Sequence, residues 1–232
     1  MPDIRADFTQ TAIVTPDRFE WVPSRGGEVE RVMLDRIGDE VAVATSLVRY
    51  PRASRFPPHE HARGEEYLVL EGEFADERGR YLPGTYVRNP PGSRHTPFSD
   101  PGCVIWVKLR QFHPDDHRQA VLTVDDPIPE EGVRRKELHR HHGEVVTDIA
   151  AADGAAVTLP AADVVQEVLM LEGGAAWEGQ YLPRWAWLRV PPGQGIELQA
   201  TAPSRLLHKT RPAFALPDAN VTGATSAASA RR

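Results

Sequence analysis

Short runs of hydrophobic residues separated by turn-forming residues make up most of the chain. The runs are rich in valine, leucine, isoleucine and aromatic residues, and 21 prolines and 18 glycines punctuate them. This composition is typical of brief β-strands joined by tight turns. Long stretches with the 3.6-residue period of an amphipathic helix are hard to find. The pattern predicts an all-β protein with strands near residues 19–22, 29–34, 41–50, 65–74, 85–89 and 103–110.

An internal repeat divides the chain into two similar parts. The matching segments are EYLVLEG at 66–72 with EVLMLEG at 167–173, RNPPG at 88–92 with RVPPG at 189–193, and YLP at 81 with YLP at 181. The first two pairs share an offset of 101 residues, and the third indicates one small insertion or deletion. Further upstream, Leu34 corresponds to Leu138 at an offset of 104. Repetition on this scale predicts two copies of one fold.

The segments outside the two copies are poor in apolar residues. Residues 1–18 are expected to form an N-terminal arm, and 111–131 a polar connector. The first domain then spans 19–125 and the second 130–216. Residues 217–232 are small and polar, so we expect a disordered tail there.

Composition and charge narrow the function. The chain has 232 residues and a formal net charge of -6, with acidic and basic residues mixed along it. We therefore expect no nucleic-acid partner and no membrane partner, because both call for clustered Lys and Arg. Cys103 is the single cysteine, which excludes an intrachain disulfide and favours a reducing, cytoplasmic setting. The N-terminal residues lack the apolar core of a signal peptide.

Three histidines and a glutamate have the spacing of metal ligands. His59 and His61 are two residues apart, so an extended strand presents both on one face. Glu65 follows, and His95 comes from a second block bounded by Gly84, Pro90 and Gly92. Imidazole and carboxylate suit Zn, Fe, Mn, Ni or Cu, and raw affinity does not choose among these metals. We expect one divalent transition metal per chain.

These residues resemble the two sequence motifs of the cupins. The match covers His59, His61, Glu65, Gly72, Gly84, Pro90, Gly92 and His95, with Ala53 and Ser99 as departures at positions that are not ligands. Residues 30–112 are closer still to the cupin module of the ChrR type, known from zinc-dependent anti-sigma factors. The resemblance implies a bicupin, in which two double-stranded β-helix (jelly-roll) barrels lie in tandem.

The second copy lacks the ligands. At an offset of 101 the positions of His59, His61, Glu65 and His95 are taken by Pro160, Ala162, Gln166 and Ile196. Trp177, Trp185 and Trp187 are expected to be core or interface residues of this copy. We therefore interpret it as a degenerate cupin domain that has kept its packing residues and lost its metal site.

Pocket residues are predicted from their nearness to the ligands in sequence. They are Arg63, Tyr67, Tyr86, Arg94 and Phe98, and Tyr67 is favoured because it shares the strand face of Glu65. Glu66 points to the opposite face, so Glu65 is assigned as the ligand. A one-residue bulge would reverse that assignment.

The remaining histidines and the cysteine favour plainer interpretations. The repeat places His139, His141 and His142 in a turn between strands, where solvated side chains are expected rather than a second metal site. His113 and His117 lie in the connector, with no specific role expected. Cys103 is on an apolar strand, which favours a small buried hydrophobe over a reactive thiol.

Two functions fit the predicted site. A metal with open positions could bind the oxygens of a small organic molecule beside dioxygen, as in a metal-dependent dioxygenase. Alternatively, the ChrR resemblance implies a non-catalytic zinc-binding sensor. Sigma-factor binding is not expected, because the chain lacks the N-terminal zinc module of those anti-sigma factors. A purely structural bicupin is least attractive with the ligands intact. Strand edges that need covering and the tryptophan-rich second half predict a homodimer.

Overall fold

The computed structural model describes residues 3–24, 27–39 and 41–212 and is composed almost entirely of β-strands. Within these residues there is one short 3-10 turn, η1 (Pro16–Arg18), and no α-helix. The predicted all-β class is confirmed. The expected tail, 217–232, lies outside the described residues.

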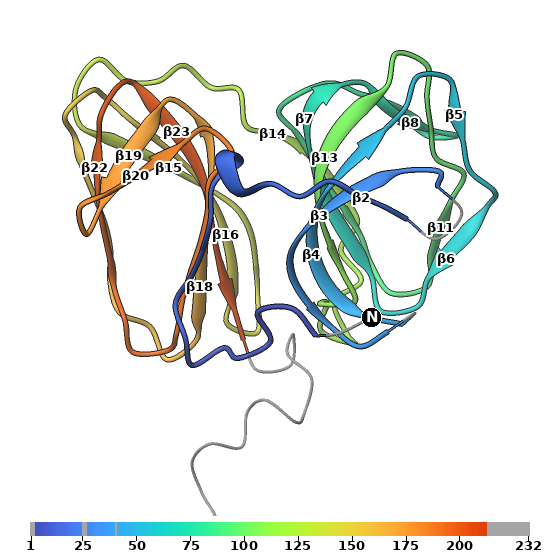
Figure 1. Cartoon of the computed structure of the whole chain (residues 1–232), viewed down its shortest axis with the longest axis horizontal. Coiled ribbons are helices and arrows are strands. Elements are labelled where there is room, and N and C mark those ends of the chain that lie inside the picture. The colour runs from blue at the N-terminus through green and yellow to red at the C-terminus, as the bar shows by residue number, and fades with distance from the viewer. Residues whose placement is uncertain (1–2, 25–26, 40, 213–232) are drawn as a thin grey trace, which may run out of the picture.

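Two β-sandwich halves lie side by side (Figure 1). The first half contains β2 (Val22–Pro23), β3 (Glu30–Ile37), β4 (Val43–Tyr50), β5 (Ser54–Arg55), β6 (His59–His61), β7 (Glu65–Gly72), β8 (Phe74–Asp76), β9 (Gly79–Tyr81), β10 (Thr85–Asn89), β11 (Ser93–His95), β12 (Phe98–Ser99), β13 (Cys103–Leu109) and β14 (Ala120–Thr123). The second half contains β1 (Ala12–Val14), β15 (Val133–His141), β16 (Glu144–Ala151), β17 (Ala156–Leu159), β18 (Val165–Glu172), β19 (Gly174–Trp177), β20 (Gln180–Pro183), β21 (Trp187–Val190), β22 (Ile196–Ala200) and β23 (Ser204–Arg211).

The two halves repeat one strand order. The larger sheet runs β14-β10-β7-β13-β4-β3-β2 in the first half and β1-β21-β18-β23-β16-β15 in the second. The smaller sheets run β5-β12-β8-β9 and β17-β22-β19-β20. The first half has in addition a two-stranded sheet, β11-β6, which carries the histidines. The strand register also tests the YLP match. Tyr81 pairs with Phe74, and the residues 101 positions later, Leu182 and Ala175, pair in the same way. The offset therefore stays at 101, and the insertion or deletion inferred from the YLP match is wrong.

The N-terminal arm packs against the second half. Its strand β1 pairs with β21 at the position that β14, from the connector, occupies beside β10 in the first half. Phe8 is buried in a small cluster with Val165. Figure 1 shows the blue N-terminal segment running from one half to the other. The arm therefore adds an edge strand to the distant half of the chain.

A central core joins the larger sheets of the two halves. It contains Leu34, Leu70, Leu138 and Leu171, and all four lie at β-bulges, where one extra residue shifts the register between neighbouring strands. A bulge redirects the side chain of the extra residue, and here that residue is a buried leucine each time. Strands apolar on both faces, such as EYLVLEG, are required because each sheet packs on both sides.

Reciprocal buried ion pairs cross the same interface. Lys108 of the first half lies 2.6 Å from Glu167 of the second, and Lys209 of the second lies 2.8 Å from Glu66 of the first. Lys108 and Lys209, like Glu66 and Glu167, are separated by 101 residues. The halves thus meet through equivalent surfaces, in the isologous manner of a two-fold dimer.

Candidate metal centre

Three histidines meet on two paired strands of the first half. His59 and His61 lie on β6 and His95 on β11, with His95 opposite His59. Each pair of ring centroids is 4.9 Å apart. The Nε2 atoms of His61 and His95 are 3.0 Å apart, and the three rings offer ligand atoms within 4.8 Å of one another. Three imidazoles therefore converge on one point.

Glu65, at the start of β7, reaches the same point. Its Oε2 lies 3.3 Å from Nε2 of His61 and 3.6 Å from Nε2 of His95. Asn89, opposite Glu65 on β10, donates a side-chain hydrogen bond of 3.3 Å to that oxygen. Glu66 points to the other half of the molecule and pairs with Lys209. Of the two neighbouring glutamates, Glu65 is the one beside the histidines.

The outer nitrogens of two rings face oxygen acceptors. Nδ1 of His59 lies 3.0 Å from the backbone oxygen of Pro57, and Nδ1 of His95 lies 3.4 Å from Oδ2 of Asp76. The oxygen acceptors favour the tautomer with the proton on the outer nitrogen, and that tautomer leaves the Nε2 lone pair for the convergence point. Lone pairs that converge repel one another unless a cation or proton lies between them. The donor set therefore fits a divalent transition metal.

Charge and burial favour the same protonation states. Burial opposes ionisation of Asp76, but hydrogen bonds from His95, the Arg78 backbone and the Tyr81 hydroxyl lower its pKa. An ionised Asp76 fixes the orientation of the His95 ring. Burial also lowers the pKa of His61, against the opposing charge of Glu65. A neutral His61 is the form that binds metal.

A cavity of about 530 Å³ opens beside the histidines. His59, His61 and Glu65 form part of its lining. The walls come mostly from the strands β3, β4 and β13, with two residues next to the histidines in sequence. The lining includes Arg31, Ala44, Ser46, Val48, Tyr50, Phe56, Pro97, Val107 and Leu109. The alternate residues of β4 line it because successive side chains of a strand point to opposite faces. Its size suits a small organic ligand.

The residues predicted to line this pocket lie elsewhere. Tyr86 is buried between the halves, where its hydroxyl donates to Glu66. Arg94 is exposed and pairs with Glu60, and Phe98 packs under the guanidinium of Arg55. None of these three residues is among the cavity lining, because neighbours in sequence along a strand alternate between faces, and their role at the site stays a prediction.

Tyr67 and Arg63 also lie outside the cavity lining. Tyr67 does share the inward face of Glu65, but it is fully buried and packs against Phe74 with ring centroids 4.7 Å apart. Arg63 is partly buried in the turn after β6. Tyr50, which was not predicted, is the tyrosine that faces the cavity. The alternation of side chains along a strand correctly predicted the face on which Tyr67 lies. It did not predict that Tyr67 packs in the core rather than in the cavity wall.

Two positioning residues were also not predicted. Asn89 holds Glu65 across a strand pair, and Asp76 holds His95 from a neighbouring sheet. Asn89 could have been found by pairing the segment after Gly84 with β7, whereas nothing in the sequence connects Asp76 with His95.

Cys103 is buried, as expected, and burial raises its pKa to about 11.

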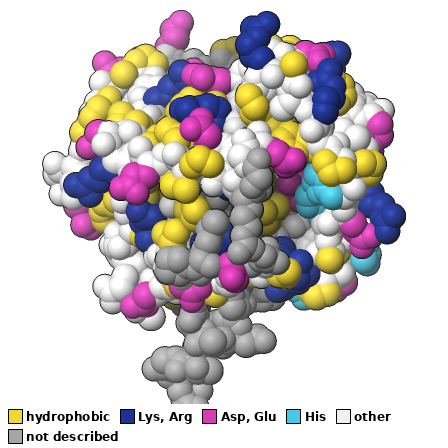
Figure 2. Space-filling view, turned by 45° about the vertical axis from the view of Figure 1, so that its right-hand side comes forward, with side chains coloured by type: hydrophobic (Ala, Val, Ile, Leu, Met, Phe, Trp, Pro, Cys, Tyr) yellow, Lys and Arg dark blue, Asp and Glu magenta, His cyan; other side chains and the backbone are white. Residues whose placement is uncertain are grey.

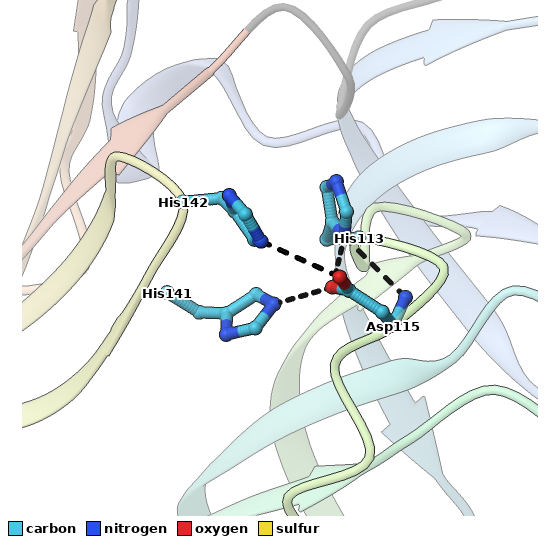
Figure 3. A group of neighbouring side chains, drawn as sticks. All are labelled: His113, Asp115, His141 and His142. Carbon is cyan, nitrogen blue, oxygen red and sulfur yellow. Dashed lines mark hydrogen bonds and ion pairs between the residues drawn. The ribbon is translucent and has the colours of Figure 1, made fainter.

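Two of the other histidines lie on a strand rather than in the turn that the sequence predicted. His139 and His141 belong to β15, and His139 is buried beside Asp116 at 3.0 Å, so their placement in a solvated turn is wrong. His113, Asp115, His141 and His142 form a second group of candidate ligands (Figure 3).

Basic and acidic side chains mix on the face shown in Figure 2. No helix in the described residues is long and apolar enough to cross a membrane.

Comparison with known proteins identifies the fold. Residues 9–113 match the family model described as ChrR Cupin-like domain. No curated protein matches the chain. A candidate dioxygenase from Nostoc punctiforme superimposes with a TM-score of 0.68 at 13% identity, covering 87% of this chain and 82% of that one.

Two further solved structures are similar. The bacterial pirin YhhW from Escherichia coli, in complex with nickel(II), gives a TM-score of 0.66 at 14% identity and covers 88% of this chain and 99% of its own. A salicylate 1,2-dioxygenase from Pseudaminobacter salicylatoxidans gives 0.62 at 12% identity, covering 88% and 84%. At these identities the comparisons show that the fold is shared.

Proposed function

We propose that this cupin-fold chain is a metal-dependent enzyme acting on a small oxygen-bearing organic molecule, with His59, His61, Glu65 and His95 as the metal ligands. The observation that carries the proposal is that three of these side chains, His59, His61 and Glu65, line a cavity of about 530 Å³. A site closed on all sides would suit a structural metal, whereas a site facing a cavity suits substrate access. The metal could be Fe, Zn, Mn or Ni.

A metal that accepts five or six ligands would retain one or two open positions beside these four protein ligands, and there it would supply Lewis-acid or redox chemistry. The chain supplies the rest of the site. Burial, followed by the charge of Glu65, raises the pKa of Tyr50, so its hydroxyl stays protonated and can donate a hydrogen bond to a substrate oxygen. Arg31 and Arg36 lie in the cavity wall together with Glu28 and Asp39, so the wall offers charged groups of both signs to the polar groups of a substrate.

Dioxygenase chemistry is the best supported activity. The fold is shared with a salicylate 1,2-dioxygenase and a candidate dioxygenase, and the cavity volume lies in the range of pockets for small ligands. Hydroxylated aromatic acids and enolised diketones combine adjacent oxygens with an apolar body. The apolar walls, Tyr50 and Arg31 fit such molecules.

A zinc sensor is the second candidate. The match of residues 9–113 to the ChrR Cupin-like domain favours it, because that module is known from zinc-dependent regulators. In this case the cavity would bind an effector rather than a substrate. The metal separates the two candidates, since zinc does not support redox chemistry with dioxygen.

The proposed domains are residues 19–125, which hold the metal, and residues 130–216, which do not. A homodimer is proposed as well, on the exposed edge strands. Trp177 and Trp187 no longer support it, because both are buried inside the chain. Light scattering at micromolar concentration tests this: a mass near 25.7 kDa would show a monomer.

The proposal is tested by metal analysis and oxygen uptake. All proteins are purified without added metal. The His61→Ala variant should contain one equivalent of metal less than the wild type, whereas the control variant His117→Ala should contain as much as the wild type. If iron is present, oxygen consumption with a panel of hydroxylated aromatic acids and diketones should depend on it. An unchanged metal content in His61→Ala would overturn the site. Bound zinc with no oxygen uptake would favour the sensor.

A further inference from the structure

A cluster of imidazoles outside the lining of the cavity joins the two halves of the chain. His113 and Asp115 lie in the connector after β13, whereas His141 ends β15 and His142 follows in the hairpin to β16. Figure 3 shows the side chains from these two segments pointing toward one another across the gap between them. We name His113, Asp115, His141 and His142 the histidine clamp. No sequence pattern connects the two histidines of the hairpin with His113 and Asp115.

The clamp has the dimensions of a metal site. The ligand atoms of its four residues all lie within 4.8 Å of one another. Nε2 of His141 is 2.7 Å from Oδ1 of Asp115, Nε2 of His142 is 3.4 Å from Oδ2, and Nδ1 of His113 contacts Oδ1. A tetrahedral zinc ion with bonds of about 2.0–2.2 Å holds its ligand atoms roughly 3.3–3.5 Å apart. Small side-chain rotations would bring the four atoms to that spacing.

The hairpin backbone places His142 toward the other three residues. His142 and Gly143 both have a positive φ, 44° and 84°, and they separate the paired residues His141 and Glu144. Two successive positive φ values are typical of the two-residue turns of β-hairpins. Among residues with a side chain, histidine is one of those that tolerate this conformation. The turn therefore directs adjacent histidines to one carboxylate.

A neighbouring group shows what a cluster already filled by cations looks like. Asp116, His139 and Glu144 are buried and close together, but Arg88 lies 2.7 Å from both carboxylates and Lys209 pairs with Glu144 as well. Protein cations occupy that site. Among the described residues, the ion pairs of Asp115 are instead all with imidazoles. Imidazoles can give up their protons to a metal, whereas Arg cannot.

We propose that the histidine clamp binds a second transition-metal ion of the zinc class, which crosslinks the connector to the second half. On a four-coordinate ion, three imidazoles and a carboxylate leave no open position. None of the four residues lines the cavity of about 530 Å³, so the role is structural rather than catalytic. Asp115 and His142 are exposed, so the ion can enter from solvent. The expected metal content of the chain becomes two ions rather than one.

Zinc titration of the full-length chain, stripped with a chelator, tests the proposal. The His61→Ala background removes the cavity site, and a chromophoric competitor reports bound zinc. We expect His61→Ala to bind one zinc ion, and His61→Ala with His141→Ala to bind none. His61→Ala with His117→Ala is the matched control, since His117 is an exposed histidine of the same connector. It should bind one ion.

A second readout covers variants that fold poorly. Asp115→Asn preserves the shape of the side chain and removes the charge, and it should weaken zinc binding by more than the roughly 10–100-fold typical of changes outside the ligand shell. Zinc should raise the thermal midpoint of His61→Ala by mass action but not that of His61→Ala with Asp115→Asn. Equal zinc binding with and without the clamp residues, or no zinc binding by a folded His61→Ala variant, would overturn the proposal. If His61→Ala contains as much metal as the wild type, that result would count against the cavity site and not against the histidine clamp.

Discussion

The two halves of the molecule have the same strand order but different interiors. The first half holds the converging histidines and a cavity, whereas the interior of the second half is filled by a core that includes Ile196, Trp177 and Leu198. Trp177 takes the position of Asp76, which orients His95 in the first half. Gln166 replaces Glu65 and donates to the backbone oxygens of Pro160 and Gln194. Apolar and amide groups have replaced each element of the site.

The surfaces by which the halves meet are similar in both. Glu66, Arg88 and Lys108 recur 101 residues later as Glu167, Arg189 and Lys209, and all six are buried. The second half therefore shares the interface residues of the first half but not its histidines and glutamate. The second half keeps the face that packs and supplies charges to the first. Its contribution to function is therefore expected to be structural.

Removing the second half should have the largest effect. A chain of residues 1–129 leaves Glu66, Arg88 and Lys108 without partners from the second half, and breaking one buried ion pair typically costs about 3–5 kcal/mol. We expect aggregation or loss of cooperative unfolding, measured by solubility and denaturant titration. A soluble 1–129 chain with an unchanged midpoint and full metal affinity would show that the halves are independent.

A single broken pair should have a smaller effect. Lys108→Met leaves Glu167 with a lost partner and should lower the free energy of unfolding by about 3 kcal/mol. Lys209→Met, the matched variant at the other end of the interface, should cost at least as much, because Lys209 pairs with both Glu66 and Glu144. Urea titrations of both variants measure this. A large loss in one and none in the other would contradict the equivalence of the two surfaces.

Changing Asp76 should affect metal binding more than stability. Asp76→Asn removes the charge facing Nδ1 of His95, and loss of such a partner typically weakens metal binding by about 10–100-fold. Competition with a chromophoric chelator measures the affinity. Asp153→Asn, an exposed change in the second half, is the control and should leave the affinity unchanged. Equal affinities in the two variants would remove Asp76 from the site.

Mild acid should have the smallest effect, and it acts through the interface. Burial opposes the ionisation of Glu144 and Glu167, but neighbouring Lys and Arg lower the pKa of each to about 2. A carboxylate with a lowered folded-state pKa stabilises the fold above its unfolded pKa, and this contribution is lost as the pH falls. Between pH 7 and pH 4 each should cost about 1 kcal/mol. Urea midpoints of chelator-treated protein measure the loss, and a midpoint that stays constant to pH 4 would contradict it.

Much of the fold was predictable because the repeat preserves apolar strand patterns. EYLVLEG and EVLMLEG became β7 and β18, equivalent strands in the two larger sheets. The pairing of β1, from the N-terminal arm, with β21 of the second half was not predictable. The sequence of β1 does not identify β21 as its partner. Pairing between distant strands depends on the packed sheet rather than on local pattern.

The grouping of the proposed ligands was predictable for a similar reason, whereas their surroundings were not. His59 and His61 are brought together by spacing along one strand, whereas Asp76 and Tyr50 reach the site from other strands. The histidine clamp was missed because its members come from two segments about 25 residues apart in sequence. Spacing within one strand can be read from sequence, and convergence between strands requires the fold.

Anomalous diffraction from crystals of the full chain tests the central contrast between the halves most directly. The account predicts a metal peak between the Nε2 atoms of His61 and His95, next to His59 and Glu65. It predicts no peak at the equivalent position in the second half, near Ala162, Gln166 and Ile196. Crystals from metal-containing solution that show no peak at the histidines, or an equal peak in the second half, would contradict it.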